Sequence, residues 1–333
     1  SLSDLSVLPG VESNTDAMPF LRSLTENTIK GYAYSSVFGG TTANSEYEFL
    51  TGNTTAFLPA GTVPYQMYVS DGDPTLVGQM AALGYRTVAA HPYRSSGWSR
   101  PSVYQDFGFD EVYFEGDFQD REYMRGDEKT GYVTDQCDYE NLIRWYEEKE
   151  AGEPLFLFNV TMQNHSGYDT GLLPADKQMH LNIDTTDLDT KTVEDGTLSD
   201  VDEYVSCIEQ SDQALRYFLN ALSKLDRKVV VVFWGDHQPF FPSKFNDKWF
   251  TDEDDATHQE RLWQTDYIIW ANYDVAGCNQ TSEVDDLSTN YLSTQLMQLI
   301  GAPLTDYQKA HMTLRESLPA INSVGYEDAS YFA

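Results

Sequence analysis

The segment RKVVVVFWGDHQP, residues 227–239, combines a predicted strand with a polar and chemically reactive end. Its β-branched and aromatic run predicts a buried strand, which delivers the adjacent Asp236 and His237 to the edge of a sheet. A carboxylate beside an imidazole suits a divalent cation such as Mn²⁺, Mg²⁺ or Zn²⁺. The alternative is an Asp and a His that only cap the end of the strand.

The order of a helix followed by a strand recurs along the chain. Amphipathic segments that predict helices precede such strands at residues 75–85, 139–152 and 201–226. The strand after the first helix ends at His91, and the strand after the second leads to Asn164 and His165. This alternation predicts an α/β fold with a mostly parallel central sheet flanked by helices. Because ligands bind beyond the carboxyl ends of strands in such sheets, we expect these residues and the Asp236–His237 pair at one edge.

The last part of the chain is predicted to form a smaller C-terminal α+β subdomain. It contains a predicted strand at residues 267–274 and a predicted helix at 288–301. We therefore divide the chain into a core at residues 1–244 and a C-terminal subdomain at 245–333, packed on the core.

Other segments are assigned from local composition. A helix is predicted at residues 18–28, near the start of the core. The acidic segments 183–203 and 245–259 are predicted to be solvated loops. The alternative for these two segments, a calcium-binding loop, lacks the ligand spacing of such loops.

The composition excludes several classes of protein. The chain has 333 residues, with 21 Lys and Arg against 53 Asp and Glu, and a formal net charge of −32. Such an acidic surface repels polyphosphate backbones, which argues against nucleic-acid binding. Hydrophobic residues make up 41% of the chain, too many for a disordered protein. The longest apolar runs fall short of the roughly 20 residues that span a bilayer.

The three cysteines give no structural signature. Cys137, Cys207 and Cys278 are far apart and form no CxxC pair, so neither a disulfide framework nor a thiolate metal site is predicted. At most one disulfide can form among them.

A glycine-rich segment precedes a pair of threonines. In FGGTTANSEYEFLTG, residues 38–52, a helical pattern begins just after Thr41 and Thr42. A hydroxyl there would face the positive end of the helix dipole. Both threonines could equally serve as helix N-caps.

Two further segments place functional side chains after strand ends. In HPYRSSGWSR, residues 91–100, His91 and Arg100 could hold a phosphate beside the apolar wall of Trp98. The alternative is a surface loop with a buried Trp. The segment NVTMQNHSGY places His165 beyond a strand end, although a lone histidine is more often structural than catalytic.

The order of four motifs, GGTTANSE, HPYRSSGWSR, TMQNHSGY and WGDHQP, resembles one known family. It is similar to the extracellular domain of the lipoteichoic acid synthase and phosphoglycerol transferase family, part of the sulfatase and alkaline phosphatase superfamily. The resemblance covers roughly residues 1–240 through these motifs and implies a sulfatase-like fold. In that family the nucleophile is a threonine four residues before a glutamate, a spacing that Thr42 and Glu46 match and Thr41 does not.

The resemblance implies roles for the other motif residues. His91, Trp98 and Arg100 match the family's phosphoglycerol pocket, although the loop has GWSR and HPY where the best-known lipoteichoic acid synthases have FWNR and HGN. The family's later histidine falls on His165, which is implied to protonate the leaving group or to bind a phosphoryl oxygen. The implied metal ligands in this sequence are Thr42, Asp236 and His237.

The family's metal site also uses a glutamate at the end of its first strand, just before a run like SDLSVL. This chain begins at SLSDLSVL, with no methionine, basic start or apolar signal core. We therefore expect the sequence to be a fragment of a longer protein. The glutamate and the strand that carries it are expected immediately upstream of Ser1.

The resemblance implies a metal-dependent phosphoglycerol transferase. Glycerol phosphate would move from phosphatidylglycerol, through a covalent phospho-threonine, to lipoteichoic acid or a surface glycan. One divalent cation is implied, Mn²⁺, with Mg²⁺ or Zn²⁺ as alternatives. The family also implies transmembrane helices ahead of this domain, which anchor it in a bacterial cell membrane with the catalytic domain outside the cell.

Other functions stay open as alternatives. Phosphoethanolamine transferases of the same superfamily typically carry several disulfides, which three cysteines cannot form. Sulfatases need a Cys or Ser in a C-x-P-x-R context, and no cysteine here has that context. A related phosphodiesterase activity is a further possibility within the superfamily. A non-catalytic module that binds glycerol phosphate would have little need for both a nucleophile and metal ligands.

Overall fold

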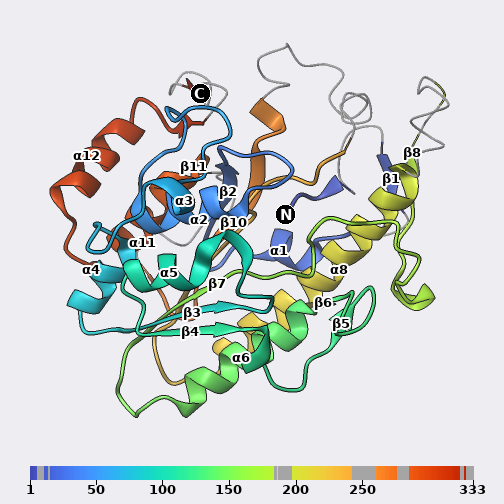
Figure 1. The fold of residues 1–333 in the computed structure, drawn as a ribbon, viewed down its shortest axis with the longest axis horizontal. Coiled ribbons are helices and arrows are strands. Elements are labelled where there is room, and N and C mark those ends of the chain that lie inside the picture. Colours follow the sequence, from blue (N-terminus) through green and yellow to red (C-terminus); the bar gives the residue numbers. More distant parts are fainter. Residues whose placement is uncertain are drawn as a thin grey trace.

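Two sheets at the centre of the molecule carry the strands predicted to lead to the site (Figure 1). The computed structural model describes residues 1–5, 11–13, 16–183, 186, 197–241, 260–275, 285–322 and 326–327. One sheet has the order β11-β2-β10-β9, with the strands β2 Thr28–Tyr34, β9 Val230–Trp234, β10 Gln264–Ala271 and β11 Leu287–Ser288. The other has the order β4-β3-β7, with the strands β3 Arg86–His91, β4 Glu111–Phe114 and β7 Leu155–Asn159.

Helices surround these sheets (Figure 1). The longer helices are α2 Thr42–Thr51, α6 Asp135–Glu148, α8 Thr197–Leu222, α11 Thr289–Leu299 and α12 Asp306–Arg315. The shorter ones are α1 Pro19–Ser23, α3 Pro64–Met67, α4 Leu76–Ala82 and α5 Arg100–Asp106, with 3₁₀ turns at Gly97–Ser99, Glu115–Asp117 and Ala175–Lys177. Short antiparallel pairs join β1 Val11–Ser13 to β8 Leu181–Ile183, β5 Tyr123–Met124 to β6 Tyr132–Val133, and β12 Ala320–Ile321 to β13 Tyr326–Glu327.

The strand β10 shows how the core is divided between two faces of the sheet. Because side chains alternate along a strand, Tyr267 and Ile269 lie in one apolar cluster with residues of α2 and α11. Ile268 and Trp270 lie in a second cluster with residues of α8 and α1. The continuous apolar run of β10 is therefore explained by burial on both faces.

The predicted α/β class is confirmed, with a difference in strand direction. Strand β3 is parallel to both β4 and β7, as predicted, but β10 is antiparallel to both β2 and β9. The predicted strand at 267–274 thus lies inside the main sheet as β10. The proposed boundary between residues 1–244 and 245–333 falls outside the described residues and stays a prediction.

Two predicted segments differ from the structure. The predicted helix 18–28 is helical only at Pro19–Ser23, because the chain from Thr28 pairs with β10 as strand β2. The predicted loop 183–203 is helical from Thr197, where Asp200 in the first turn complements the positive end of the dipole of α8. The predicted loop 245–259 lies outside the described residues.

Cys137 and Cys207 are buried free thiols, and Cys278 lies outside the described residues. In the part of the chain that the structure describes, no helix has the length and apolar character needed to cross a bilayer.

Gly235 joins β9 to Asp236 at a place without room for a side chain. A Cβ at this position would lie 2.8 Å from the Cβ atoms of Leu2 and Thr265. We expect Gly235→Ala to lower the free energy of unfolding by about 1–3 kcal/mol, because the neighbours must move apart. Urea denaturation would measure the change. Gly116→Ala is the matched control, since its Cβ would meet nothing within 4 Å, and equal midpoints for the two variants would contradict the prediction.

Candidate active site

Thr42 begins helix α2 and directs its hydroxyl at the end of β9. Its Oγ1 donates a hydrogen bond of 2.6 Å to Asp236 Oδ2. Thr41 occupies the N-cap position in the left-handed region, with φ of 64°, and no side chain caps the helix there. The structure therefore uses neither threonine as a side-chain cap. The Thr42 hydroxyl lies at the positive end of the helix dipole instead.

Serine hydroxyls fix the end of β9 against α2. The backbone carbonyl of Asp236 accepts a hydrogen bond of 2.8 Å from Ser35 Oγ, just after β2, and another from Ser45 Oγ on α2. The two serine oxygens are 3.1 Å apart. Asp236 is thus tied to β2 and α2 through its main chain, which leaves its carboxylate to face Thr42.

His237 lies beside the same carboxylate. Its Nε2 is 3.2 Å from Asp236 Oδ2, and its Nδ1 is 2.7 Å from the carbonyl oxygen of Gln238. Because a carbonyl only accepts, we place the ring proton on Nδ1, which leaves a lone pair on Nε2. Asp236 and His237 therefore do more than cap the strand, since both side chains converge with Thr42 on one point.

The charges at this point follow from burial and close neighbours. Burial alone would raise the pKa of the Asp236 carboxyl, but the neighbouring His237 and the hydrogen bond from the Thr42 hydroxyl lower it. Burial lowers the pKa of His237, which favours the neutral ring. The site therefore presents an ionised carboxylate, a neutral imidazole and a hydroxyl.

This donor set fits a divalent cation in kind but is short of ligands. Carboxylate, imidazole and hydroxyl groups all suit Mn²⁺ or Zn²⁺. Among the described residues, no group of three or more His, Cys, Asp and Glu side chains gathers as a metal site. A further carboxylate would be needed to complete a shell around Asp236, His237 and Thr42.

Ser1 connects two of the predicted loops. Its backbone nitrogen is 3.0 Å from Asp236 Oδ1, and its Oγ donates a hydrogen bond of 3.2 Å to the carbonyl of Asn164. The backbone N–H of Leu2 donates to the carbonyl of His237 at 3.3 Å. The predicted polar ends of β7 and β9 are therefore brought together around Ser1.

Glu46 and Arg100 form a buried ion pair one helical turn after Thr42. Arg100 Nε lies 3.1 Å from Glu46 Oε1, Arg100 Nη2 contacts the same oxygen, and both residues are 3% exposed or less. Tyr104 and Tyr65 donate their hydroxyls to Glu46 Oε2 at 2.7 and 3.1 Å. Burial opposes the charge on Arg100, yet Glu46 raises the pKa of the guanidinium further above its usual value. The positive charge of Arg100 is thus already neutralised within the protein.

His91 and Trp98 border this ion pair. His91 Nδ1 is 2.8 Å from the carbonyl of Val160, and Arg100 Nη1 approaches His91 Nε2 at 3.4 Å. Burial and the charge of Arg100 lower the pKa of His91 to about 3, so the ring is neutral at physiological pH. Trp98 is partly buried against the core, with φ of 57°. The loop therefore has the partly buried Trp of the structural alternative, together with a linked His91–Arg100 pair.

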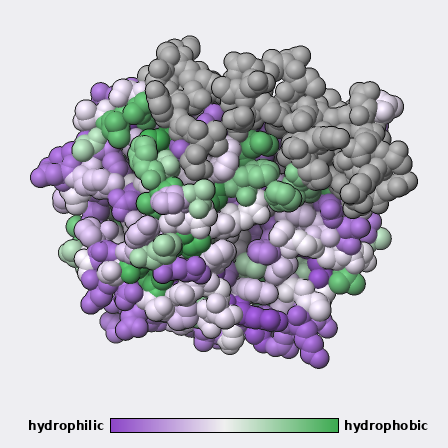
Figure 2. Space-filling model, turned by 45° about the horizontal axis from the view of Figure 1, so that its top comes forward, coloured by the Kyte–Doolittle hydropathy of each residue, from purple (hydrophilic) through white to green (hydrophobic). Residues whose placement is uncertain are grey.

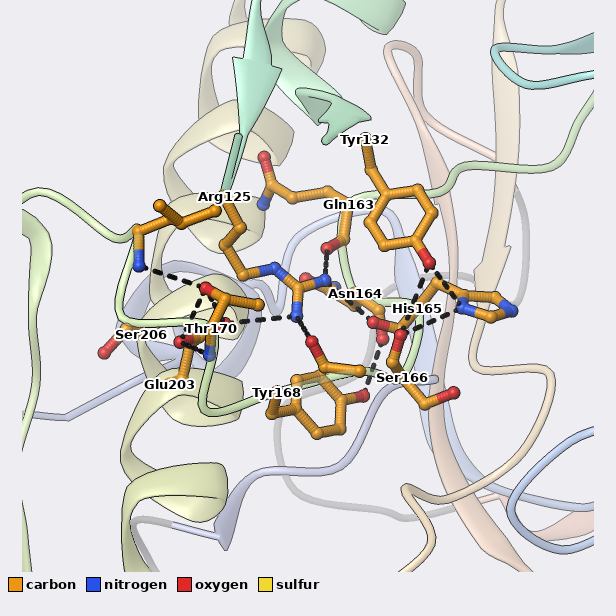
Figure 3. A network of polar contacts seen from close by, with 12 residues as sticks. Arg125, Tyr132, Gln163, Asn164, His165, Ser166, Tyr168, Thr170, Glu203 and Ser206 are labelled. Carbon is orange, nitrogen blue, oxygen red and sulfur yellow. Dashed lines mark hydrogen bonds and ion pairs between the residues drawn. The ribbon is translucent and has the colours of Figure 1, made fainter. Parts of the chain in front are cut away.

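His165 is an exposed residue of the loop that follows β7, and Tyr132 lies beside its ring (Figure 3). Its Nδ1 is 3.2 Å from the hydroxyl of Tyr132 and 3.2 Å from the carbonyl of Ser166. Desolvation lowers the pKa of His165, an effect that the contact with the carbonyl of Ser166 and the charge of Asp236 oppose. No hydrogen bond between His165 and Thr42 or Asp236 occurs among the described residues. The structure thus places His165 close to the centre without a direct contact to it.

Several residues of the site were not identified from the sequence. They are Ser35, Ser45, Tyr65, Tyr104, Arg125 and Glu203. Single hydroxyls and a lone Arg or Glu carry no spacing signal. Ser45 is the exception: it directly precedes Glu46 in the motif GTTANSE, so the motif could have identified it.

Curated relatives have names that refer to glycans. The chain is 28% identical over 313 residues to a putative cyclic beta-1,2-glucan modification protein of Rhizobium meliloti (strain 1021), a match that covers 90% of this chain and 44% of that protein. It is 27% identical over 230 residues to the capsular polysaccharide biosynthesis protein RkpI of the same organism, with 68% and 38% covered. The chain thus spans less than half the length of either relative.

Solved structures share the fold. The Streptococcus pyogenes phosphoglycerol transferase GacH, in complex with sn-glycerol-1-phosphate, matches with a TM-score of 0.75 and 22% identity, over 94% of this chain and 76% of that chain. The lipoteichoic acid synthase LtaP from Listeria monocytogenes matches with a TM-score of 0.69 and 21% identity, over 91% and 71%. The sulfatase family profile matches residues 6–302, and the chain therefore belongs to the sulfatase family, with the α/β fold of the alkaline phosphatase superfamily.

Proposed function

We propose that this domain transfers glycerol phosphate from phosphatidylglycerol to a cell-envelope polymer, through a covalent phospho-threonine at Thr42. The observation that carries the proposal is the hydrogen bond of 2.6 Å from Thr42 Oγ1 to Asp236 Oδ2 at the start of α2. It holds a hydroxyl nucleophile where a helix dipole favours an incoming phosphate. The likeness of the fold to a phosphoglycerol transferase supports the choice of reaction.

The transfer takes place in two steps, and the protons balance over the two. Thr42 Oγ1 bonds to phosphorus, the bond to the diacylglycerol oxygen breaks, and protonated His165 gives that oxygen its proton. Because the low pKa of Asp236 makes it a poor base, we assign Asp236 to orient the hydroxyl while the Thr42 proton passes to water. An acceptor hydroxyl then bonds to phosphorus and returns a proton to His165, while Thr42 leaves and is reprotonated by water.

One divalent cation is proposed at Thr42, Asp236 and His237. Mn²⁺ suits this mixture of oxygen and nitrogen donors, with Mg²⁺ and Zn²⁺ as alternatives. When bound, such a cation lowers the pKa of a coordinated hydroxyl and neutralises phosphoryl charge.

A glutamate joined directly ahead of Ser1 would enter this site, as the motif order implies. Support comes from an opening between β7 and β9. In the described residues, β7 pairs with β3 alone and β9 with β10 alone, so each has an edge without a neighbour. A cavity of about 690 Å³ lies between them, lined by Phe156, Phe158, Val230, Val232 and Trp234 among others.

The strand β9 supports the same proposal. Its residues are apolar, yet every one of them is only partly buried. Trp234 Nε1 and Asn159 Oδ1 are buried without a hydrogen-bond partner in the described part of the chain. A strand seated between β7 and β9 and ending at Ser1 would cover these side chains and pair both edges. Its last residue would then lie beside Asp236.

His91, Trp98 and Arg100 are proposed to border the phosphoglycerol group. Arg100 forms an ion pair with Glu46, and Glu46 lies one helical turn after the nucleophile Thr42. Because Glu46 neutralises Arg100, this pocket is expected to bind the glycerol hydroxyls by hydrogen bonds more than the phosphate by charge. The acceptor is proposed to be a glycerol-phosphate polymer or a glycan, and the glycan-related names of two relatives support the latter.

The domain is proposed to act outside a bacterial cell, beside the membrane to which helices upstream of Ser1 would anchor it. On the face drawn in Figure 2, apolar patches lie among polar side chains. With a net charge of −32, close approach to anionic lipid needs a compensating cation at the site. Phosphoethanolamine transfer, sulfate ester or phosphodiester hydrolysis, and binding without turnover are the alternatives.

Thr42→Ala in a protein extended upstream of Ser1 is expected to reduce transfer roughly 10⁴-fold or more, because the covalent step is lost. Diacylglycerol release from labelled phosphatidylglycerol vesicles with Mn²⁺ measures this. Thr41→Ala is the matched control and should retain activity. Release by Thr42→Ala at the control rate would refute the nucleophile. Turnover of phosphatidylethanolamine or an aryl sulfate instead would overturn the substrate.

Replacing the glutamate expected ahead of Ser1 by Gln should abolish Mn²⁺-dependent stabilisation of the extended protein. A metal present at about 100 times its Kd adds roughly 2.7 kcal/mol to the unfolding free energy. Thermal unfolding with Mn²⁺ and with a chelator compares the extended protein, its Gln variant and the chain that starts at Ser1. Equal Mn²⁺ stabilisation of all three would contradict the missing ligand.

Arg100→Met is expected to lower the unfolding free energy by about 3–5 kcal/mol, because Glu46 would be left buried without its cation. Chemical denaturation measures this loss. The double variant Glu46→Gln/Arg100→Met removes both charges and should recover most of it. A single variant as stable as the wild type would show that the ion pair has no structural role.

A further inference from the structure

The loop that carries His165 has little regular structure of its own. It follows β7 and runs through Gln163, Asn164, His165 and Gly167 with only turns and bends. A loop of this kind needs partners for its backbone carbonyls, since buried carbonyls without them cost free energy. Three of these carbonyls have one side chain as their partner, Arg125, which follows β5 (Figure 3).

Arg125 donates hydrogen bonds to three carbonyl oxygens along this loop. Its Nη2 donates to the carbonyls of Gln163 and His165 at 2.9 and 2.7 Å, and its Nη1 donates to that of Gly167 at 3.2 Å. The three acceptors are alternate residues of one short stretch. The planar guanidinium therefore fixes the main chain on both sides of the His165 ring and at His165 itself.

The charge of Arg125 is balanced inside the protein. Its side chain is 1% exposed, and Nη1 lies 3.4 Å from Glu203 Oε1 on α8. Glu203 in turn accepts hydrogen bonds from the backbone N–H and hydroxyl of Thr170 at 2.8 and 3.0 Å. The ion pair thus ties both ends of the loop to α8. Such a buried cation is not available to an anionic substrate.

The rings of Tyr132 and Tyr168 lie beside the Arg125 guanidinium, and Tyr132 also contacts His165. The Arg125 guanidinium lies 5.4 Å from the ring centre of Tyr132 and 5.1 Å from that of Tyr168. The Tyr132 hydroxyl is 3.2 Å from His165 Nδ1, and the Tyr168 hydroxyl donates to the carbonyl of Asn164 at 2.8 Å. Arg125 therefore contacts both the backbone of His165 and the tyrosine that meets its ring.

The backbone of Arg125 is itself held in an uncommon conformation. Its φ of 58° lies in the left-handed region, which costs a non-glycine residue of the order of 1 kcal/mol. Gly126, with φ of 132°, completes the turn. This conformation is maintained by the carbonyl bonds and the ion pair, which indicates that the side chain is specifically placed.

We propose that Arg125 is the positioning residue of His165: it fixes the loop backbone so that Nδ1 faces Tyr132 and Ser166 and Nε2 is directed to the reacting phosphate. The assignment of a phosphate to His165 rests on the proposed function. The carbonyl of Ser166 can only accept, which places the proton of the neutral ring on Nδ1. Nε2 is left as the nitrogen that exchanges a proton with substrate.

The first test observes His165 without substrate. Arg125→Lys and Arg125→Ala are compared with the wild type by the NMR signals of the His165 imidazole, assigned by their loss in His165→Gln. Both variants should shift these signals, and guanidinium at millimolar concentration should partly restore them in Arg125→Ala. Arg144→Lys is the control, since Arg144 pairs with Asp120 on the surface and should leave the signals unchanged. Unchanged His165 signals in a folded Arg125→Ala would overturn the proposal.

Two further measurements distinguish a variant that fails to fold from a failure of the positioning role or of the proposed function. Where Arg125→Ala does not fold, Arg125→Lys carries the test, because it keeps the charge beside Glu203 and loses the planar set of donors to the three carbonyls, and unchanged His165 signals in that variant would contradict the proposal. In an active extended protein, Arg125→Lys should lower kcat about 100-fold with KM unchanged, as for a misplaced catalytic group. If phosphatidylglycerol is not a substrate, the NMR result alone supports or overturns the positioning role.

Discussion

The hydrogen bond from Thr42 to Asp236 joins the first residue of α2 to the end of β9, and the other features of the site depend on it. It forms because Ser35 and Ser45 hold the Asp236 carbonyl between β2 and α2, so the carboxylate has one direction in which to point. The same contact keeps a charged group at the positive end of a helix, where ionisation is favoured. A strand end, a helix start and a buried carboxylate are thereby linked in a single contact.

The two buried arginines near this centre, Arg100 and Arg125, have different roles. Arg100 pairs with Glu46 on the nucleophile helix, so removal of either partner would leave a charge in the core. Arg125 gives most of its donors to main-chain carbonyls and only one to Glu203. One guanidinium therefore stabilises the helix that begins at Thr42, while the other fixes a loop. In a chain of net charge −32, both cations have internal carboxylate partners.

Sequence patterns predicted the parts of this structure that depend on local periodicity. The strands ending near His91 and Asp236 were predicted because apolar runs there are followed by polar residues, and the structure has β3 and β9 at those places. The direction of β10 was not predictable, since an apolar strand buried on both faces has the same pattern in either direction. Arg125 was missed for another reason: its partners are backbone carbonyls, which leave no trace in side-chain spacing.

The edges of β7 and β9 connect the fold to the chemistry of the site. A parallel strand between them would end at Ser1, whose backbone nitrogen already lies 3.0 Å from Asp236 Oδ1. Beside this opening, burial raises the pKa of Asp135 to about 6 and that of Asp138 well above its usual range, and one oxygen of each lacks a partner in the described chain. One upstream strand would therefore both complete the sheet and supply the missing metal ligand, because it would pair with both edges and bring its last residue to Asp236.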